Sequence, residues 1–349
     1  MRIRRWFILL LLVLGSCSTN TPSHKLLQTE PLCIKIHPSS GISALTFTPD
    51  GSSLAIGGDR DVKLLENNEW VEKRSFKTAE RPITSVAISP DSRLLACGTA
   101  NRASSAPTVY VWERISGQPV AEFRSGVEHV NCVVFSPDGS KLAVASEDGS
   151  IRLYETIKWT LLATISENAK KAQRIVYSPD GKYIAARGHD GSVVVYDAVS
   201  GETKAELGGM DGEGRKLAFS PDGAYLASAT QLFDYFGNVK EGKIVVWDTI
   251  NWRMCAELRG HTYSIRALAF HPKGGMLVTA GQVKGCDQVW CWDTSNWKER
   301  CGIQFYPRPH CHCNGLCFSP DGKTLVGGTT SENIYIWDWD QVVQLADQE

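Results

Sequence analysis

The chain has 349 residues, of which 42% are hydrophobic and 21% are charged, and its formal net charge is −1. This composition is ample for a buried core and close to the globular average, while Gly (31 residues) and short β-rich runs take the place of long helical patterns. The absence of basic character argues against a nucleic-acid partner.

The N-terminus is predicted to be a targeting segment. Three arginines within the first five residues precede the apolar run Trp6–Leu14, which is shorter than the roughly 20 residues needed to span a bilayer. The next letters, Gly-Ser-Cys ending at Cys17, complete a sequence that resembles a bacterial lipobox. The resemblance implies a signal peptide over residues 1–16 and lipidation of Cys17. An ordinary cleaved signal or a short anchor is the alternative.

Residues 17–31 are predicted to be a flexible, lipid-linked tether, because Ser18–Ser23 is polar and turn-prone. The resemblance implies an exported protein anchored in the bacterial cell envelope, with its domain in the periplasm or on the surface. Ser18 is not Asp, which favours the outer membrane in a cell with two membranes. Removing three arginines leaves 34 of the 37 basic residues, against 38 acidic ones. Export implies an oxidising compartment in which cysteines can form disulfides.

A short turn motif recurs seven times in the remaining chain. It reads TPDG at Thr48, SPDS at Ser89, SPDG at Ser136, Ser178, Ser220 and Ser319, and HPKG at His271. Each copy lies between two apolar runs, and a third run ends in a large apolar residue and an acid: VKLLE, VYVWE, IRLYE, VVVYD, IVVWD, VWCWD and IYIWD. Pro and Asp suit the first two turn positions, and Gly supplies a positive φ. Each unit is therefore predicted to form four short antiparallel strands, a to d.

Units that repeat every 41 to 51 residues, three of them with Trp-Asp at the end of the third run, resemble the WD40 repeat. Seven of them imply an all-β, seven-bladed β-propeller of four-stranded antiparallel blades over residues 32–349. In this family an N-terminal strand closes the ring, so Leu32–Ile36 is expected to pair with Ile334–Trp337. The alternative is that the C-terminal QVVQLA sequence completes blade seven.

One blade retains the Gly-His element that is common in the family, at Gly260 and His261. The resemblance implies a hydrogen-bond network of His261, Thr279, Asp287 and Trp292, although Asp287 lies one place from the usual spacing. Elsewhere, apolar packing between sheets is expected to hold the blades together.

The turns between strands a and b and between c and d are short in every blade, whereas the b–c and d–a loops carry the insertions. Binding residues concentrate on variable loops, so a protein or peptide partner is expected on the b–c/d–a face. The predicted partner-binding residues are Phe233, Tyr235, Phe236, Tyr306, Arg308, His310 and His312. The aromatic residues of blade five are the main anchors, unless they pack back onto the propeller rim.

A ring of polar residues is expected to line the central channel, one from each strand a: Ser43, Thr84, Asn131, Gln173, Arg215, Arg266 and Asn314. Arg215 and Arg266, with neighbouring Arg174 and Lys216, make one arc of the channel mouth basic, which suits an acidic peptide or a small anion. A water-filled channel with solvated walls is the favoured interpretation.

The loop YPRPHCHC, at 306–313, resembles no zinc-ligand spacing. A disulfide from Cys311 or Cys313 to Cys286 is preferred over a metal site, and no metal or cofactor is expected.

The sequence favours a non-catalytic, monomeric binding scaffold over a propeller enzyme of the hydrolase or lyase type. The seven ring positions contain no Asp, Glu, His or Cys that could act as acid, base or ligand. A small-ligand or metal sensor at the channel mouth is the third hypothesis.

Overall fold

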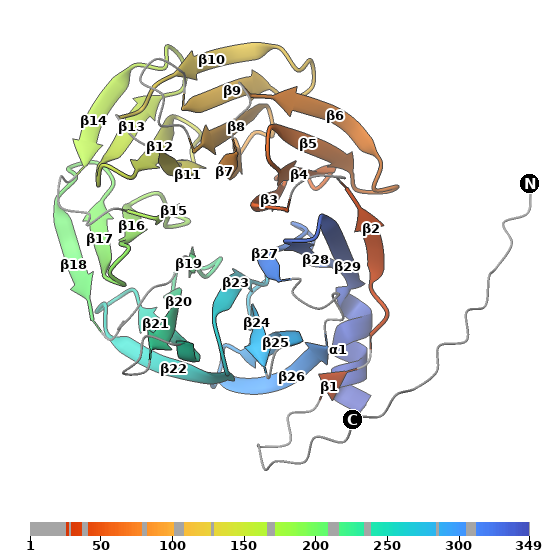
Figure 1. The fold of residues 1–349 in the computed structure, drawn as a ribbon. Helices are drawn as coiled ribbons and strands as arrows, with labels where there is room; N and C mark the ends of the chain where they lie inside the picture. The colour runs from red at the N-terminus through yellow and green to blue at the C-terminus, as the bar shows by residue number, and fades with distance from the viewer. Residues whose placement is uncertain are drawn as a thin grey trace, which may run out of the picture.

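The computed structural model describes residues 26–27, 29–36, 41–78, 82–100, 108–126, 129–165, 172–208, 216–233, 239–283, 286–304 and 312–348. Seven antiparallel sheets stand around one axis and close into a ring (Figure 1). The prediction of an all-β, seven-bladed propeller with four-stranded blades is confirmed.

The first five blades each take four consecutive strands, from the axis outward. They are β3 (Ala44–Phe47), β4 (Ser53–Gly57), β5 (Asp61–Glu66) and β6 (Glu72–Lys77); β7 (Ile83–Ile88), β8 (Leu94–Thr99), β9 (Val109–Glu113) and β10 (Pro119–Phe123); β11 (Val130–Phe135), β12 (Lys141–Ser146), β13 (Ile151–Glu155) and β14 (Leu161–Ile165); β15 (Arg174–Tyr177), β16 (Tyr183–Arg187), β17 (Val193–Asp197) and β18 (Thr203–Leu207); β19 (Lys216–Phe219), β20 (Tyr225–Phe233), β21 (Val239–Asp248) and β22 (Met254–His261).

The last two blades also use N-terminal strands. Blade six consists of β23 (Ile265–Phe270), β24 (Met276–Val283), β25 (Cys286–Asp293), β26 (Lys298–Gln304) and β1 (Leu26–Leu27). Blade seven consists of β27 (Cys313–Phe318), β28 (Thr324–Thr329), β29 (Asn333–Asp338) and β2 (Leu32–Lys35), and α1 (Trp339–Gln348) follows it.

The a–b turns form as their residues dictate. In blade three the Ser136 hydroxyl donates to Asp138 Oδ1 (2.6 Å) and accepts from the Lys141 N–H (2.9 Å). Gly139 has a φ of 72°, which costs glycine nothing. Blade two places Ser92 in the same role at a φ of 60°, so the turn geometry persists without glycine.

Apolar side chains fill the spaces between blades. Trp247 of β21 is 1% exposed and packs in one cluster with Val193 and Val195 of blade four. Close approach also requires small residues on strand b: a Cβ on Gly98 would lie 2.4 Å from Val130 Cγ1 of blade three. The expected packing between sheets therefore holds neighbouring blades together.

The ring is closed by an N-terminal strand, as predicted. β2 pairs antiparallel with β29, with Leu32 opposite Ile336 and Ile34 opposite Ile334. The alternative, a C-terminal strand, is wrong, because the tail forms α1. Asp338 begins that helix and accepts a bond of 3.2 Å from the N–H of Gln341, which is a helix N-cap contact.

The ordered fold begins before the predicted domain boundary at residue 32. Leu26 and Leu27, which were expected in the flexible tether, pair parallel with Gly302 and Ile303 of β26. Leu27 is 1% exposed and packs in one cluster with Trp339 and Val342 of α1. The two ends of the described chain therefore meet at blades six and seven (Figure 1).

Candidate functional site

Paired strands account for much of the insertion in blade five. The sequence predicts a loop for this b–c connection, but Gln231 pairs with Gly242 and Phe233 with Val239. In blade six, Gln282 pairs with Asp287 in the same way. These b–c connections are longer hairpins because an antiparallel ladder can continue wherever both strands have paired residues in register.

Few of the predicted partner-binding side chains can be placed. Phe233 lies on β20, where its backbone is described and its side chain is not. Tyr235, Phe236, Tyr306, Arg308 and His310 lie outside the described residues. His312 is half-buried beside the longer hairpin of blade six.

His312 joins blades six and seven. Its Nδ1 lies 3.0 Å from Gln282 Nε2 and 3.5 Å from Asp287 Oδ1. Its backbone N–H donates to Thr330 Oγ1 (3.0 Å). The direction of the hydrogen bond between Gln282 and His312 depends on the tautomer of the imidazole ring. This histidine therefore positions the entry to blade seven.

The proposed four-residue network holds three of its members together. Thr279 Oγ1 accepts from Trp292 Nε1 (2.9 Å) and lies 3.0 Å from His261 Nε2. His261 and Thr279 are fully buried. Gly260 has a φ of 140°, and a Cβ there would lie 1.9 Å from the Trp290 ring, so glycine is required before His261.

Asp287, the fourth expected member of this network, lies elsewhere. Its Oδ2 accepts from the backbone N–H of Cys313 (2.5 Å) in blade seven. Side chains alternate along a strand: Trp290 and Trp292 pack with blade five, whereas Val289 and Cys291 pack with blade seven. The one-place offset of Asp287 therefore turns it away from His261 and toward blade seven. Asp287 lies an even number of residues from Val289 and Cys291, so the alternation of side chains along the strand could have shown that it faces blade seven.

The disulfide prediction falls mainly on side chains that are not described. Cys311 and the side chain of Cys286 lie outside the described part of the chain. Cys313 is buried, with its Sγ 3.3 Å from the Gly315 carbonyl oxygen. Within the described ranges, no group of three or more His, Cys, Asp or Glu residues is arranged to hold a metal ion.

Strand-a side chains surround a small hollow at the propeller axis. Its lining includes Arg174, Lys216, Ser43 and Asn314. The described lining contains two cations and no carboxylate. Of the other basic residues predicted there, Arg266 lies on β23 with its Nε buried, and Arg215 lies outside the described residues.

The polar ring has a structural role. Three of its side chains bond to a backbone carbonyl of the next blade: Thr84 to Val130 (2.6 Å), Asn131 to Ala172 (3.1 Å) and Asn314 to Ile42 (3.3 Å). These bonds join neighbouring innermost strands. These three polar side chains thus satisfy backbone acceptors of the neighbouring blade.

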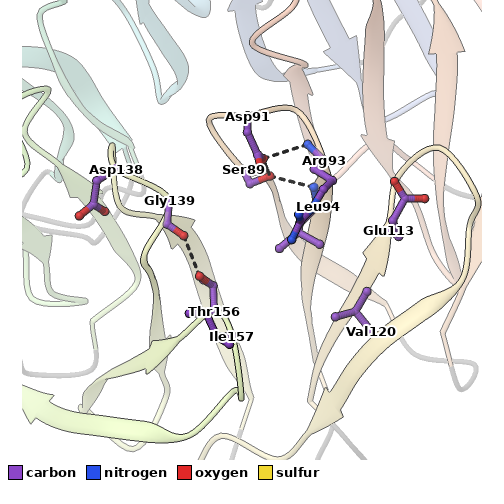
Figure 2. Close-up of a pocket in the computed structure, with 10 residues that line it drawn as sticks. All are labelled: Ser89, Asp91, Arg93, Leu94, Glu113, Val120, Asp138, Gly139, Thr156 and Ile157. Atoms are coloured by element: carbon purple, nitrogen blue, oxygen red, sulfur yellow. Dashed lines mark hydrogen bonds between the residues drawn. The ribbon is translucent and has the colours of Figure 1, made fainter.

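A second hollow, of about 1070 Å³ including its solvent-open space, lies on the opposite face between blades two and three (Figure 2). Asp91, Glu113 and Asp138 surround it with Val120 and Ile157. Hydrogen bonds from nearby serines lower the pKa of each of these carboxyls, so all three are ionised near neutral pH.

That face, expected to be uniform, also carries a repeated apolar feature. The residue two places after the acid of strand c is an exposed aliphatic in four successive blades. These residues and their exposed fractions are Ile115 (69%), Ile157 (85%), Val199 (83%) and Ile250 (87%). This face therefore carries a row of exposed aliphatic side chains although its turns are short.

Cys17 and the segment before it lie outside the described residues. Within the ranges that are described, no helix is both long enough and apolar enough to cross a membrane.

Seven blades, whose third strands end in a large apolar residue and an acid and in three blades in Trp-Asp, define a β-propeller built from sequence repeats. The family described as WD domain, G-beta repeat (WD40) matches residues 29–65, 70–113, 117–155, 159–197, 252–293 and 303–338. The chain belongs to this family. The unmatched stretch, 198–251, contains strands a to c of blade five, and strands b and c are the longest in that blade.

Relatives match only parts of their own length. Protein HIR1 of Eremothecium gossypii is 24% identical over 183 residues, 48% of this chain and 22% of that protein. Serine-threonine kinase receptor-associated protein of Rattus norvegicus is 28% identical over 118 residues, 33% of this chain and 31% of that protein. The matched regions thus span under a third of these relatives.

Among solved structures, a chain of Kuenenia stuttgartiensis Hydrazine Synthase has a TM-score of 0.74 and 19% identity. The alignment covers 86% of this chain and 96% of that one. At this identity the likeness shows a shared fold.

Proposed function

We propose that this protein is a non-catalytic scaffold that binds a protein or peptide through its b–c/d–a face. The observation that carries the proposal is the lengthening of the b–c hairpins in blades five and six on a fold whose a–b turns are nearly identical. A rigid framework with variable extensions suits recognition. Membership of the WD40 family, with relatives such as a receptor-associated protein, supports a protein partner.

The proposal includes a lipid anchor on Cys17 and a position in the bacterial cell envelope. The support is the sequence of the first 17 residues. Labelling of the cells with a fatty-acid analogue tests this: wild type should carry the label in the membrane fraction, and Cys17→Ser should not. Equal labelling of the two proteins would rule out Cys17 as the acceptor.

Photocrosslinking in intact envelopes tests the binding face. A photoreactive residue at His312 reports on the b–c/d–a face, and one at Ile157, which is 85% exposed, reports on the opposite face. We expect His312 to capture a specific partner that is lost in the Phe233/Tyr235/Phe236 triple alanine variant. Capture from Ile157 with none from His312 would assign binding to the other face.

The basic channel mouth supports a second candidate, binding of an acidic peptide. Lys216 and Arg174 both line the axial hollow. A fluorescent poly-glutamate peptide should bind wild type more tightly than the Arg174→Gln variant, and the difference should shrink as salt rises. Equal, salt-independent binding would remove this candidate.

A further inference from the structure

The third and fourth strands of blade six, β25 and β26, bring two cysteines opposite each other. Cys291 of β25 and Cys301 of β26 are directly paired in the antiparallel register. Cys291 is 0% exposed and Cys301 is 3% exposed, and both belong to the same apolar cluster. Their side chains therefore lie on the same face of the sheet and contact each other as thiols.

Four other blades show that this position needs no cysteine. The same register pair, one step before the bulge between strands c and d, is Val111–Ala121 in blade two, Leu153–Ala163 in blade three, Val195–Ala205 in blade four and Val246–Ala256 in blade five. An aliphatic residue opposite alanine satisfies the packing there. Blade six replaces both members with cysteine.

The backbone geometry suits a covalent bond. Residues directly opposite on antiparallel strands have Cα atoms about 4.5–5.5 Å apart. Disulfides join Cα atoms about 4.4–6.8 Å apart. The two ranges overlap, so the register of β25 and β26 suits a disulfide between Cys291 and Cys301.

We propose that Cys291 and Cys301 are a dithiol–disulfide site that fastens β26, the fourth strand of blade six, to β25. A small disulfide of the glutathione class is the oxidant. The Cys301 thiolate attacks one of its sulfur atoms and releases one thiol. The Cys291 thiolate then attacks the mixed disulfide at the Cys301 sulfur and releases the second thiol. Two protein thiols become one S–S bond, and the oxidant disulfide becomes two thiols.

The order of attack follows from the local electrostatics. The hydrogen bond from the Cys291 thiol lowers the pKa of Cys301, and the charge of neighbouring Arg300 acts in the same direction. That same contact, together with burial, raises the pKa of Cys291. Cys301 also lies on β26, next to Gly302, which pairs with Leu26 of β1. A disulfide between Cys291 and Cys301 would thus strengthen the sheet of blade six, in which β1 pairs with β26.

Redox titration of the full-length protein tests the site. The protein is equilibrated in buffers with rising ratios of glutathione disulfide to glutathione, both as the folded chain and during refolding from urea. Remaining thiols are then alkylated under denaturing conditions and mapped by peptide mass spectrometry. We expect Cys291 and Cys301 to lose alkylation together and to appear as one linked peptide pair. Cys97 and Cys132 are buried single cysteines and should remain alkylated as internal controls.

The matched variant is Cys291→Val with Cys301→Ala, which recreates the pairs of blades two, four and five. It should fold, and its Tm should be the same in oxidising and reducing buffer, whereas the Tm of wild type should rise on oxidation. Full alkylation of both cysteines after refolding in the most oxidising buffer would overturn the proposal. A linkage of either cysteine to a different partner would overturn it as well.

Discussion

The carboxylate of Asp287 accepts a 2.5 Å hydrogen bond from the backbone N–H of Cys313, which links blade six to the first strand of blade seven. Asp287 is 2% exposed, so water cannot replace it. Asp287→Ala should lower the free energy of unfolding by about 2–3 kcal/mol, because it leaves a buried donor without its charged acceptor. Urea denaturation measures this. Asp287→Asn keeps an acceptor and should lose less. Equal stability of the alanine variant and wild type would contradict this role.

Thr279 of blade six supports two other buried groups, Trp292 in its own blade and His261 at the end of β22 in blade five. Thr279→Val removes the hydroxyl that Trp292 and His261 share and leaves two buried ring nitrogens without this partner. Stability should fall by about 2–4 kcal/mol, measured by urea denaturation. Thr203→Val on the exposed surface of β18 is the matched control and should change stability by less than about 0.5 kcal/mol. A loss at Thr279 no larger than the control would mean that the network does not stabilise the blade.

Lys216 reaches across the channel mouth from blade five to blade seven, where its Nζ donates to the Asn314 carbonyl oxygen (2.6 Å). Lys216→Met should cost about 1.5–3 kcal/mol, since a charge-assisted bond is lost while the aliphatic stem is kept. Thermal denaturation measures the effect. Lys204→Met on exposed β18 is the control for removing a positive charge. Identical losses for the two variants would assign the effect to net charge instead of this contact.

Acid should unfold the protein through its turns. A serine hydroxyl two residues earlier holds the pKa of Asp91, Asp138, Asp222 and Asp321 below the ordinary value of 3.8. A lowered pKa in the folded state adds stability that is present above about pH 4 and is lost as the pH falls through the folded values. Urea midpoints measured from pH 6 to pH 2 should therefore decline below about pH 4. Replacing all four residues with Asn should flatten this decline, and an unchanged decline would exclude the turns as its source.

Ring closure depends on one edge strand. The Ile36 N–H donates to the backbone carbonyl oxygen of Glu332 in blade seven (2.9 Å). The Ile34 N–H, two residues earlier on the strand, therefore faces β29 as well. Ile34→Pro should remove a ladder bond and destabilise the protein by more than about 1 kcal/mol. Lys35→Pro, whose N–H faces away from β29, is the matched control and should be tolerated. Size-exclusion chromatography and thermal denaturation measure the two variants. Equal tolerance of both would show that β2 does not hold the ring closed.

Much of the fold could be predicted because its signals are local. Each Ser-Pro-Asp-Gly turn contains its own hydrogen bonds and its own residue of positive φ. The period-two apolar runs on either side of a turn determine which side chains face the neighbouring blades. The partner of Leu32–Lys35 was expected from the resemblance to the WD40 family, in which an N-terminal strand closes the ring.

The site was harder to predict because it depends on contacts between blades. The sequence grouped Asp287 with His261, although their side chains lie on opposite faces of blade six. It gave no sign that Lys216 reaches Asn314, which lies 98 residues away in the chain. It also assigned Leu26–Leu27 to a tether, because two apolar residues do not form a recognisable pattern without β26 beside them.

The sequence by itself determined the number of blades, the chemistry of their turns and the strand that closes the ring, since those features need only neighbouring residues or a repeat count. Only the tertiary structure decided which side chains meet across strands and blades. Cys291 and Cys301 illustrate the difference: nine residues separate them in the chain, and the bulge beside them determines the register that places one opposite the other. A shift of that register by one residue would turn the two side chains to opposite faces of the sheet.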